Sequence, residues 1–458
     1  MFSSFDPWRT AAVACDVASA QHDLPAGIAA RQSRRLKALL AQAARRSPLY
    51  REILRGGAEP GLADLPVMRR QELMRRFDQW VADPRLELDE LRRFVADPRR
   101  IGEPFAGRYI VWESSGSTGH PAIFVQDSAA LAVYDALEAL RRPSLQPQRR
   151  RWDPWLLGER IAFVGATTGH FASTVSVQRL RRLNPFLAKA VRSISFLQPV
   201  RELVAALNAH APTILVTYPS AAVLLAEEAR AGRLHIAPQE IWTGGEGLTP
   251  AMRCFVQQTF RCPVSNSYGA SEFLALASEC RFGRLHLNSD WVILESVDAE
   301  GRPVPPGEPG AATLLTNLAN HVQPLIRYEL GDRVAVAPQA CPCGSPLPAI
   351  EVQGRVDDVI VMHDDHRRPV RLLPLALTTV LEDQAHVFDF LLTQQGHHAL
   401  RLRVGEHGEA GQRAAQRARQ ALGDYLQRQG LPDVQLDCAC GRTGHRGRSG
   451  KVQRVVAG

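Results

Sequence analysis

Short apolar runs that alternate with helix-like stretches constrain the fold of this chain more than any other feature. The runs are rich in β-branched residues and occupy 108–112, 161–165, 213–217 and 262–267. Apolar residues at helical spacing separate several of them, as at 200–209 and 220–232. Strands that are apolar throughout are typical of sheets covered by helices on both faces. The sequence therefore predicts an α/β fold whose large domain consists of layered α/β subdomains.

The two ends of the chain differ from this core. Residues 1–105 have apolar positions at helical spacing and predict a helical N-terminal region. Residues 284–336 contain strand-like runs broken by Gly and Pro, which predict a small, antiparallel, β-barrel-like subdomain. Because 458 residues exceed one ordinary domain, we expect a large domain over 1–354 and a small α+β domain over 355–458. The small domain would contain strands near 358–362 and 387–393, a helix near 372–383 and an amphipathic helix over 410–427.

Charge and composition exclude several classes of protein. The net charge is +8, but its arginines are scattered and no aromatic-interleaved basic motif accompanies them, so we expect no nucleic-acid partner. No apolar run approaches the roughly 20 residues of a membrane-spanning helix, so no membrane insertion is expected. The first ten residues lack the pattern of a secretion signal, which indicates a cytoplasmic protein. Eight cysteines in such a chain favour metal binding or burial over disulfides.

A Ser/Gly/Thr stretch, SSGSTGHP at 114–121, follows the strand-like run RYIVW. Its small residues would let the backbone approach phosphate oxygens, and its hydroxyl groups add hydrogen-bond donors. The stretch lacks the Gly-Lys-Ser/Thr ending of a P-loop. Taken alone, it is equally typical of an ordinary flexible loop.

The order of the motifs that follow gives this loop a specific meaning. They are YGASE at 268–272, YELGD at 328–332, GRVDD at 354–358 and GK at 450–451. Together with the loop, they resemble the adenylate-forming superfamily of acyl-CoA synthetases, luciferases and peptide-synthetase adenylation domains. The GGE at 244–246 and the CPCG at 341–344 are similar to its phenylacetate–CoA ligase-like branch. The resemblance covers about 105–458 and implies an AMP-forming acid–thiol ligase that uses ATP and Mg²⁺.

The resemblance also implies a nucleotide site. The residues expected to hold the β- and γ-phosphates are Ser114, Ser115, Gly116, Ser117, Thr118 and Gly119. Ser271 would contact the α-phosphate, and Glu272 would bind Mg²⁺, a hard cation that prefers oxygen ligands. Asp332 would accept hydrogen bonds from the ribose hydroxyls, and Arg355 would donate to them. The residues expected to border the rest of the nucleotide are Gly244, Gly245, Glu246, Tyr268 and Gly269. For the GGE segment, a simple strand-to-helix turn capped near Thr249 is the alternative.

Lys451 is the expected catalytic cation. A point charge that reaches the attacking carboxylate and the departing pyrophosphate stabilises the transition state selectively. The chain has only three lysines, so one in the expected Gly-Lys pair favours function over a basic solvated tail. The resemblance further implies that the small C-terminal domain is mobile and pivots at Asp357, the hinge residue.

Two positions depart from the branch. His120 stands where a lysine is usual, so the loop lacks a full positive charge. The segment 354–370 lacks the usual glycine after the hinge, and its MHDDHRRPV portion predicts a polar hairpin. The acceptor therefore stays open between CoA and the phosphopantetheine arm of an acyl or aryl carrier protein. Transfer to an amine, a hydroxyl or a cofactor and a degenerate, non-catalytic homologue are the alternatives.

Four residues form a candidate zinc site of the Cys₃His type, namely Cys280, His286, Cys341 and Cys343. Tetrahedral zinc accepts this mixture of ligands, and four protein ligands leave no open position, as in a structural site. A rival set would join Cys341 and Cys343 to Cys438 and Cys440 across the domain boundary. Four metal-free residues are the second alternative.

The resemblance places the small-molecule carboxylic acid beside the YGASE loop. The residues expected to line its pocket are Tyr218, Pro219, Ser220, Asn266, Tyr268 and His170, with Trp242 and Phe273 nearby. Several of these are aromatic, which favours a planar aryl acid. A simple structural role is the alternative for His170.

Overall fold

The computed structural model describes residues 5–55, 61–114, 122–142, 158–308, 310–353, 359–387, 389–441 and 452–457, with isolated positions between these ranges. Its centre is a nine-stranded mixed sheet in the order β13-β14-β9-β8-β7-β6-β5-β3-β4. The parallel strands are β4 (Val191–Ser195), β3 (Ile161–Gly165), β5 (Ile214–Thr217), β6 (Glu240–Gly244) and β7 (Val264–Ala270). The antiparallel strands are β8 (Phe273–Glu279), β9 (Leu285–Leu287), β14 (Ala349–Gln353) and β13 (Arg333–Val336).

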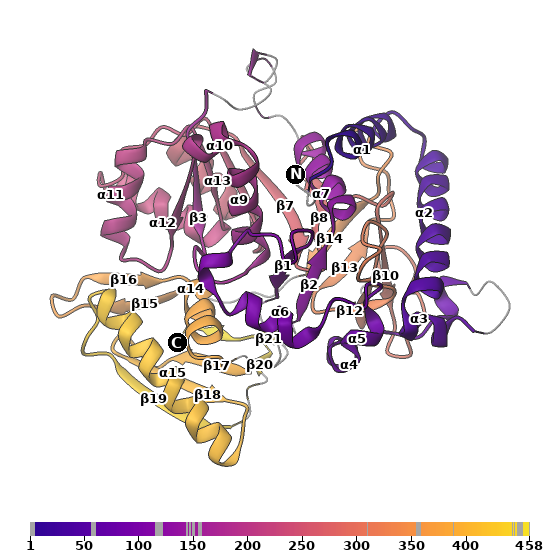
Figure 1. Ribbon diagram of the computed structural model, residues 1–458. Helices are drawn as coiled ribbons and strands as arrows, with labels where there is room; N and C mark the ends of the chain where they lie inside the picture. Colours follow the sequence, from indigo (N-terminus) through magenta and orange to yellow (C-terminus); the bar gives the residue numbers. More distant parts are fainter. Residues whose placement is uncertain are drawn as a thin grey trace.

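Helices lie against the parallel part of this sheet (Figure 1). They are α9 (Ala172–Leu183), α10 (Pro185–Ala190), α11 (Val200–His210), α12 (Pro219–Arg230) and α13 (Pro250–Phe260), whereas α7 (Ser128–Arg141) packs against the antiparallel strand β8. Alternate residues of β3 enter the core, since Ala162 and Val164 are fully buried beneath the helices. The predicted α/β class with layered subdomains is confirmed.

Smaller sheets complete the large unit. Strands β1 (Ile110–Glu113) and β2 (Ile123–Gln126) pair antiparallel and flank the Ser/Gly/Thr stretch in the sequence, and β10 (Val292–Val297), β11 (Ala312–Asn317) and β12 (Tyr328–Leu330) form a three-stranded sheet. The predicted antiparallel subdomain is thus present, with its strands divided between two sheets. The hydroxyl of Ser296 on β10 donates to the carbonyl of Val334 on β13, which joins these sheets.

The N-terminal region is helical, as predicted. It contains α1 (Pro7–Ala20), α2 (Pro25–Arg46), α3 (Pro48–Ile53), α4 (Arg70–Arg75), α5 (Phe77–Trp80) and α6 (Leu88–Val95). The first three helices begin with proline, whose fixed φ suits a first helical position and whose missing N–H is not needed there. Asp6 caps α1 by accepting from the Arg9 N–H at 3.1 Å, and Ser47 caps α3 through the Tyr50 N–H at 3.3 Å.

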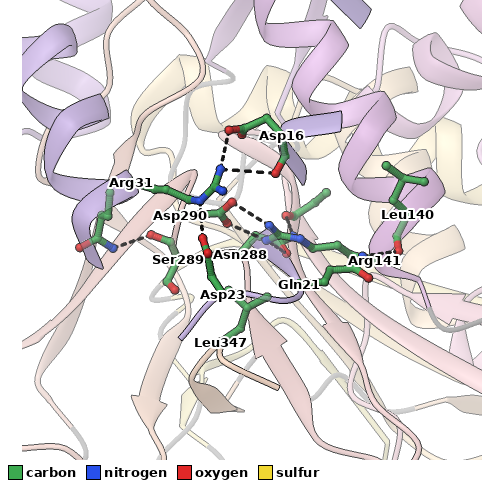
Figure 2. A network of polar contacts seen from close by, with 12 residues as sticks. Asp16, Gln21, Asp23, Arg31, Leu140, Arg141, Asn288, Ser289, Asp290 and Leu347 are labelled. Atoms are coloured by element: carbon green, nitrogen blue, oxygen red, sulfur yellow. Dashed lines mark hydrogen bonds and ion pairs between the residues drawn. The ribbon is translucent and has the colours of Figure 1, made fainter. Parts of the chain in front are cut away.

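A buried ion-pair network attaches this helical region to the large unit (Figure 2). Arg141 at the end of α7 donates to both carboxylate oxygens of Asp290, at 2.6 and 2.7 Å. Both side chains are almost completely buried. Arg35 of α2 also lies 3.4 Å from Asp290, while Arg31 pairs with Asp16 of α1 at 2.5 Å. Asp290 therefore links α2, α7 and the turn before β10.

We expect Asp290→Asn to destabilise the protein by roughly 2–3 kcal/mol, because it leaves the buried Arg141 without a matched charge while the amide still accepts one hydrogen bond. The measurement is the free energy of unfolding in urea. Asp298→Asn is the control: it removes a carboxylate from a solvent-exposed pair with Arg302, where we expect a change of less than about 1 kcal/mol. Equal losses in the two variants would contradict a special role for Asp290.

The C-terminal region has the predicted α+β composition. A hairpin of β15 (Ile360–His363) and β16 (Pro369–Leu372) confirms the polar hairpin expected around MHDDHRRPV. A four-stranded sheet follows, with β19 (Gln435–Cys440), β18 (Ala399–Val404), β17 (Phe390–Gln394) and β22 (Val455–Val456). The remaining elements are α14 (Pro374–Thr379), a π-helical turn (Val380–Gln384), α15 (Gly408–Arg428), and β20 (His445–Arg446) paired with β21 (Val452–Gln453). Helix α15 buries Ala414, Ala418, Leu422 and Leu426, the apolar face predicted for 410–427.

The domain division at 354/355 stays a prediction, because Asp357, the residue expected to be the hinge, lies outside the described residues. No helix in the part of the chain that the structure describes is long and apolar enough to cross a membrane.

Candidate functional site

A cleft of about 2600 Å³ extends along one face of the parallel strands and past their carboxyl ends. This edge is where α/β sheets ordinarily bind ligands. The predicted site residues that line it are Ser114, Tyr218, Ser220, Gly244, Gly245, Glu246, Asn266, Tyr268, Gly269, Ser271, Glu272 and Asp332. Residues separated by more than two hundred positions in the sequence are thus brought together. Ser115, Gly116, Ser117, Thr118, Gly119, His120, Arg355, Asp357 and Lys451 lie outside the described residues.

The YGASE motif forms the tight turn from β7 to β8, one wall of this cleft. A side chain at Gly269 would place its Cβ 2.0 Å from the carbonyl oxygen of Leu274, so only glycine fits there. The indole N–H of Trp112 on β1 donates to the carbonyl of Ser271 at 2.8 Å. This bond joins the turn to strand β1, and Ser271, Glu272 and Ser114 line the same cleft.

The carboxylate of Glu272 is 5% exposed and lies beside an arginine from the N-terminal region. Arg70 of α4 approaches Oε1 of Glu272 at 3.4 Å, and its Nε donates to the Tyr328 hydroxyl at 3.1 Å. Burial raises the pKa of the Tyr328 hydroxyl, and the Glu272 carboxylate raises it further. A carboxylate that lines this cleft is the kind of oxygen ligand that a magnesium ion prefers.

Arg70 was not among the predicted site residues, because the sequence gives it only as part of a basic run. Its position depends on a long-range contact: Met68 pairs with β12, its N–H donating to the Arg327 carbonyl and its carbonyl accepting from the Glu329 N–H, both at 2.9 Å. This pairing places α4 over the YELGD motif. No local sequence signal reveals it.

Asp332 follows β12 and faces β7 across the cleft. The hydroxyl of Tyr268 donates to its carboxylate at 3.1 Å. Burial, reinforced by the negative charge of Asp332, raises the pKa of Tyr268 well above its ordinary value, so Tyr268 stays a hydrogen-bond donor. The YGASE and YELGD motifs therefore meet at one point of the cleft.

The GGE segment ends strand β6, and its glutamate also holds the first turn of helix α12. Glu246 accepts from the backbone N–H and the hydroxyl of Ser220, each at 3.0 Å, at the first turn of α12. Gly245 has a φ of +78°, and a Cβ there would lie 2.9 Å from the Tyr218 ring. Thr249 caps α13 through the Met252 N–H at 3.2 Å, as the turn interpretation expected. The segment thus packs glycine backbone against an aromatic side chain within the cleft.

The predicted acid-pocket residues divide into two groups. Tyr218, Ser220, Asn266 and Tyr268 line the cleft, whereas Pro219 is buried in the start of α12 and is not among the lining residues. His170 is fully buried, packs 5.6 Å from the Phe94 ring and does not line the cleft. The expectation that His170 meets the carboxylate was therefore wrong: the residue is part of the core, and burial lowers its pKa.

The C-terminal region closes one side of the cleft. Thr378, Glu382 and Arg454 line it, and Arg454 pairs with Glu382 at 2.6 Å. Across from them lies Glu113, the residue before Ser114. Burial, reinforced by the nearby carboxylates of Asp383 and Glu382, raises the pKa of Glu113 to about 7. Nothing in the local sequence indicated this carboxyl group.

A candidate metal centre lies at the far side of the antiparallel strands. The ligand atoms of Cys280, His286, Cys341 and Cys343 all lie within 4.8 Å of one another. The sulfurs of Cys280 and Cys341 are 3.8 Å apart, which is about the sulfur–sulfur spacing around tetrahedral zinc. Nδ1 of His286 lies 2.8 Å from the Leu347 carbonyl, an arrangement that leaves Nε2 available to a metal. Cys438 and Cys440 lie on β19, in the sheet of the C-terminal region, and are not part of this cluster. The rival set, which would join them to Cys341 and Cys343, is therefore wrong.

Comparisons with known proteins agree with this architecture. Residues 109–314 match the family model of AMP-binding enzymes. The chain is 27% identical over 372 residues to the phenylacetate–coenzyme A ligase of Thermus thermophilus, covering 76% of this chain and 74% of that protein. It is 30% identical to the protein CapK of Staphylococcus aureus over 101 residues, which is 22% of this chain and 21% of CapK.

A solved structure of 2-hydroxyisobutyryl-CoA ligase, in complex with 2-HIB-AMP and CoA in the thioesterification state, has the same fold. It aligns with a TM-score of 0.54 and 20% identity, covering 93% of this chain and 90% of that one. The predicted resemblance is thus confirmed in that residues 109–314 match AMP-binding enzymes, the chain is a homologue of a phenylacetate–CoA ligase, and it shares the fold of a solved acyl-CoA ligase.

Proposed function

We propose that the chain activates a carboxylic acid with ATP and then transfers the acyl group to a thiol. In the first step a carboxylate oxygen bonds to the α-phosphorus, the bond from that phosphorus to the bridging oxygen breaks, and pyrophosphate leaves. In the second step the thiol sulfur bonds to the acyl carbon and AMP leaves. The observation that carries the proposal is that Glu272, Asp332, Tyr268 and Ser114 meet in one cleft.

Each residue has a proposed role. Mg²⁺ bound by Glu272 would neutralise charge on the phosphates, which weakens the repulsion of the incoming carboxylate. Asp332, oriented by Tyr268, would accept from the ribose hydroxyls together with Arg355. Ser271 and the Ser114–Gly119 loop would donate to phosphate oxygens. Arg70, beside Glu272, would supply positive charge near a loop that has His120 in place of lysine. Lys451 would stabilise the transition state, and Asp357 would be the hinge of the small domain.

The finer assignments are proposals of the same kind. Tyr218 and Trp242 line the cleft and favour an aryl acid, because planar rings stack and bury apolar surface there. The solved 2-hydroxyisobutyryl-CoA ligase binds CoA, which favours CoA as the acceptor, with a carrier-protein phosphopantetheine arm as the alternative. Transfer to an amine or a hydroxyl is the second candidate, motivated by the unusual segment after Asp357.

The test is acid-dependent exchange of labelled pyrophosphate into ATP, across a panel of aryl and aliphatic acids. Thioester formation is then measured with CoA and with a phosphopantetheinylated carrier protein. Exchange with at least one acid supports activation, and the productive acceptor identifies the second step. Nucleotide binding without exchange for any acid would favour a non-catalytic homologue.

We also propose that Cys280, His286, Cys341 and Cys343 hold a structural zinc ion. Purified protein should contain about one zinc per chain, because four protein ligands complete the tetrahedral coordination of a structural zinc ion. Cys341→Ser should lose most of this zinc and unfold at a lower temperature, because metal binding free energy contributes to folding. The measurements are metal content and thermal unfolding. Cys254→Ser, which changes an exposed cysteine, should keep the zinc. Wild-type protein without stoichiometric zinc would contradict the site.

A further inference from the structure

An apolar groove continues from the proposed acid pocket, between α7 and α9. Its floor consists of alternate residues on one face of neighbouring strands, which are Ile161, Phe163, Val216 and Trp242. Its apolar wall consists of Val177, Leu180 and Leu183 of α9, with Phe186 of α10 at the outer end. We call the cavity that these residues line the acid groove. They form one continuous cavity with Tyr218, Gly244 and Ser271.

Helix α9 packs Val175 into the core but directs Val177, Leu180 and Leu183 toward the groove. It buries Arg179, which is 4% exposed and donates to both carboxylate oxygens of Asp135 at 2.9 and 2.8 Å. Leu180 is 41% exposed and Phe186 is 72% exposed. A surface helix normally buries its leucines and exposes its arginines. The apolar stripe of α9 therefore faces the groove instead of the core.

The groove is longer than a single ring requires. Residues of α9 line it at Ala172, Ser176, Val177, Leu180 and Leu183, which is helical spacing over the whole helix. At 1.5 Å per residue, this wall is ~16 Å long. Ala172 is at the end near the nucleotide site, and Leu183 is at the far end.

The charged groups along the groove are matched within the protein. Asp135 is paired with Arg179, and Glu138 is paired with Arg142, whose guanidinium lies over the Trp242 ring at 4.4 Å. Glu240 accepts from the Trp242 indole N–H at 2.9 Å. These contacts leave the apolar stripe as the part of the groove that an occupant would contact.

We infer that the acid groove binds the body of the substrate acid, and that this acid has an extended apolar tail that reaches Leu180. We identify the ligand of the groove as the substrate acid because the groove is continuous with the cleft. It opens into the cleft at the site where the carboxylate would be activated. This inference rests on the proposed function and specifies its substrate class. An acid with one ring next to its carboxyl group would leave the outer half of the groove empty.

The test compares acids that share a ring and differ in length: phenylacetate, phenylbutyrate and phenylhexanoate. Each buried methylene should raise kcat/KM for pyrophosphate exchange by about fourfold. Phenylhexanoate has four more methylenes than phenylacetate, so burial of only two of them should already give it an advantage of at least about tenfold. In Leu180→Glu, exchange with phenylhexanoate should fall by at least about tenfold, because a charge would contact the tail. Exchange with phenylacetate should fall by a smaller factor than exchange with phenylhexanoate in this variant, because the shorter acid ends before Leu180. Leu24→Glu, at an exposed site outside the groove, is the control and should leave both acids unaffected.

Direct binding separates this inference from the proposed function. Binding of phenylhexanoate without ATP, measured by calorimetry, should be tighter than that of phenylacetate and should weaken in Leu180→Glu. Exchange that is equal for all three acids would overturn the extended tail while leaving acid activation intact. If no acid supports exchange, the proposed function fails, and equal binding of the three acids would then overturn the groove as well.

Discussion

Replacing Lys451 with alanine is expected to lower acid-dependent pyrophosphate exchange by about 10³-fold. Adenylation brings a carboxylate to a phosphorus centre that already carries negative oxygens, and the departing pyrophosphate carries more charge. A positioned ammonium group acts most strongly where this charge develops, so its loss reduces kcat rather than ATP affinity. Acid and ATP binding should therefore change little in the variant.

The second half-reaction distinguishes a catalytic role from a structural one. With a supplied acyl-adenylate, Lys451→Ala should form thioester at a rate close to that of the wild type, because that step breaks no bond to pyrophosphate. Lys37→Ala, which removes an exposed lysine on α2, is the control for the loss of one charge. Unchanged exchange in Lys451→Ala, or an equal loss in both half-reactions, would refute the assignment.

Much of the fold could be predicted because its signals are local. The runs at 161–165 and 213–217 are β3 and β5 nearly to the residue, since continuous apolar runs bounded by turns indicate buried parallel strands. The stripe of alanines and leucines in 410–427 likewise marks the buried face of α15. These residues contact the core through a periodicity that the sequence itself displays.

The features that sequence reasoning missed depend on contacts between distant segments. Arg70 reaches Glu272 only because Met68 pairs with β12. His170 looked like a loop residue above the pocket, but it packs beneath the N-terminal helix α6 against Phe94. The zinc ligands illustrate the same limit, because sequence spacing left two sets open. The pairing of His286 with Ala349 brings β9 beside β14 and selects one set.

Glu272→Gln is expected to lower pyrophosphate exchange by about 10²–10³-fold and to raise the Mg²⁺ concentration needed for half-maximal rate. Glutamine keeps the shape of the side chain and one oxygen ligand, but it removes the negative charge that attracts a divalent cation. It also leaves Arg70, which lies 3.4 Å away, without the carboxylate that partly offsets its charge. Excess Mg²⁺ should therefore restore only part of the activity.

Arg70 provides the decisive comparison for Glu272. If Arg70 only orients this carboxylate, Arg70→Ala should have little further effect once Glu272→Gln is present, and the two losses should not add. If Arg70 instead contacts phosphate, as the lack of a lysine at His120 favours, the losses should multiply and the KM for ATP should rise in Arg70→Ala alone. Glu300→Gln, at an exposed turn, controls for loss of one carboxylate. A Glu272→Gln enzyme with a normal rate and a normal Mg²⁺ dependence would remove Glu272 from the metal site, and the proposed division of roles between Glu272 and Arg70 would fail with it.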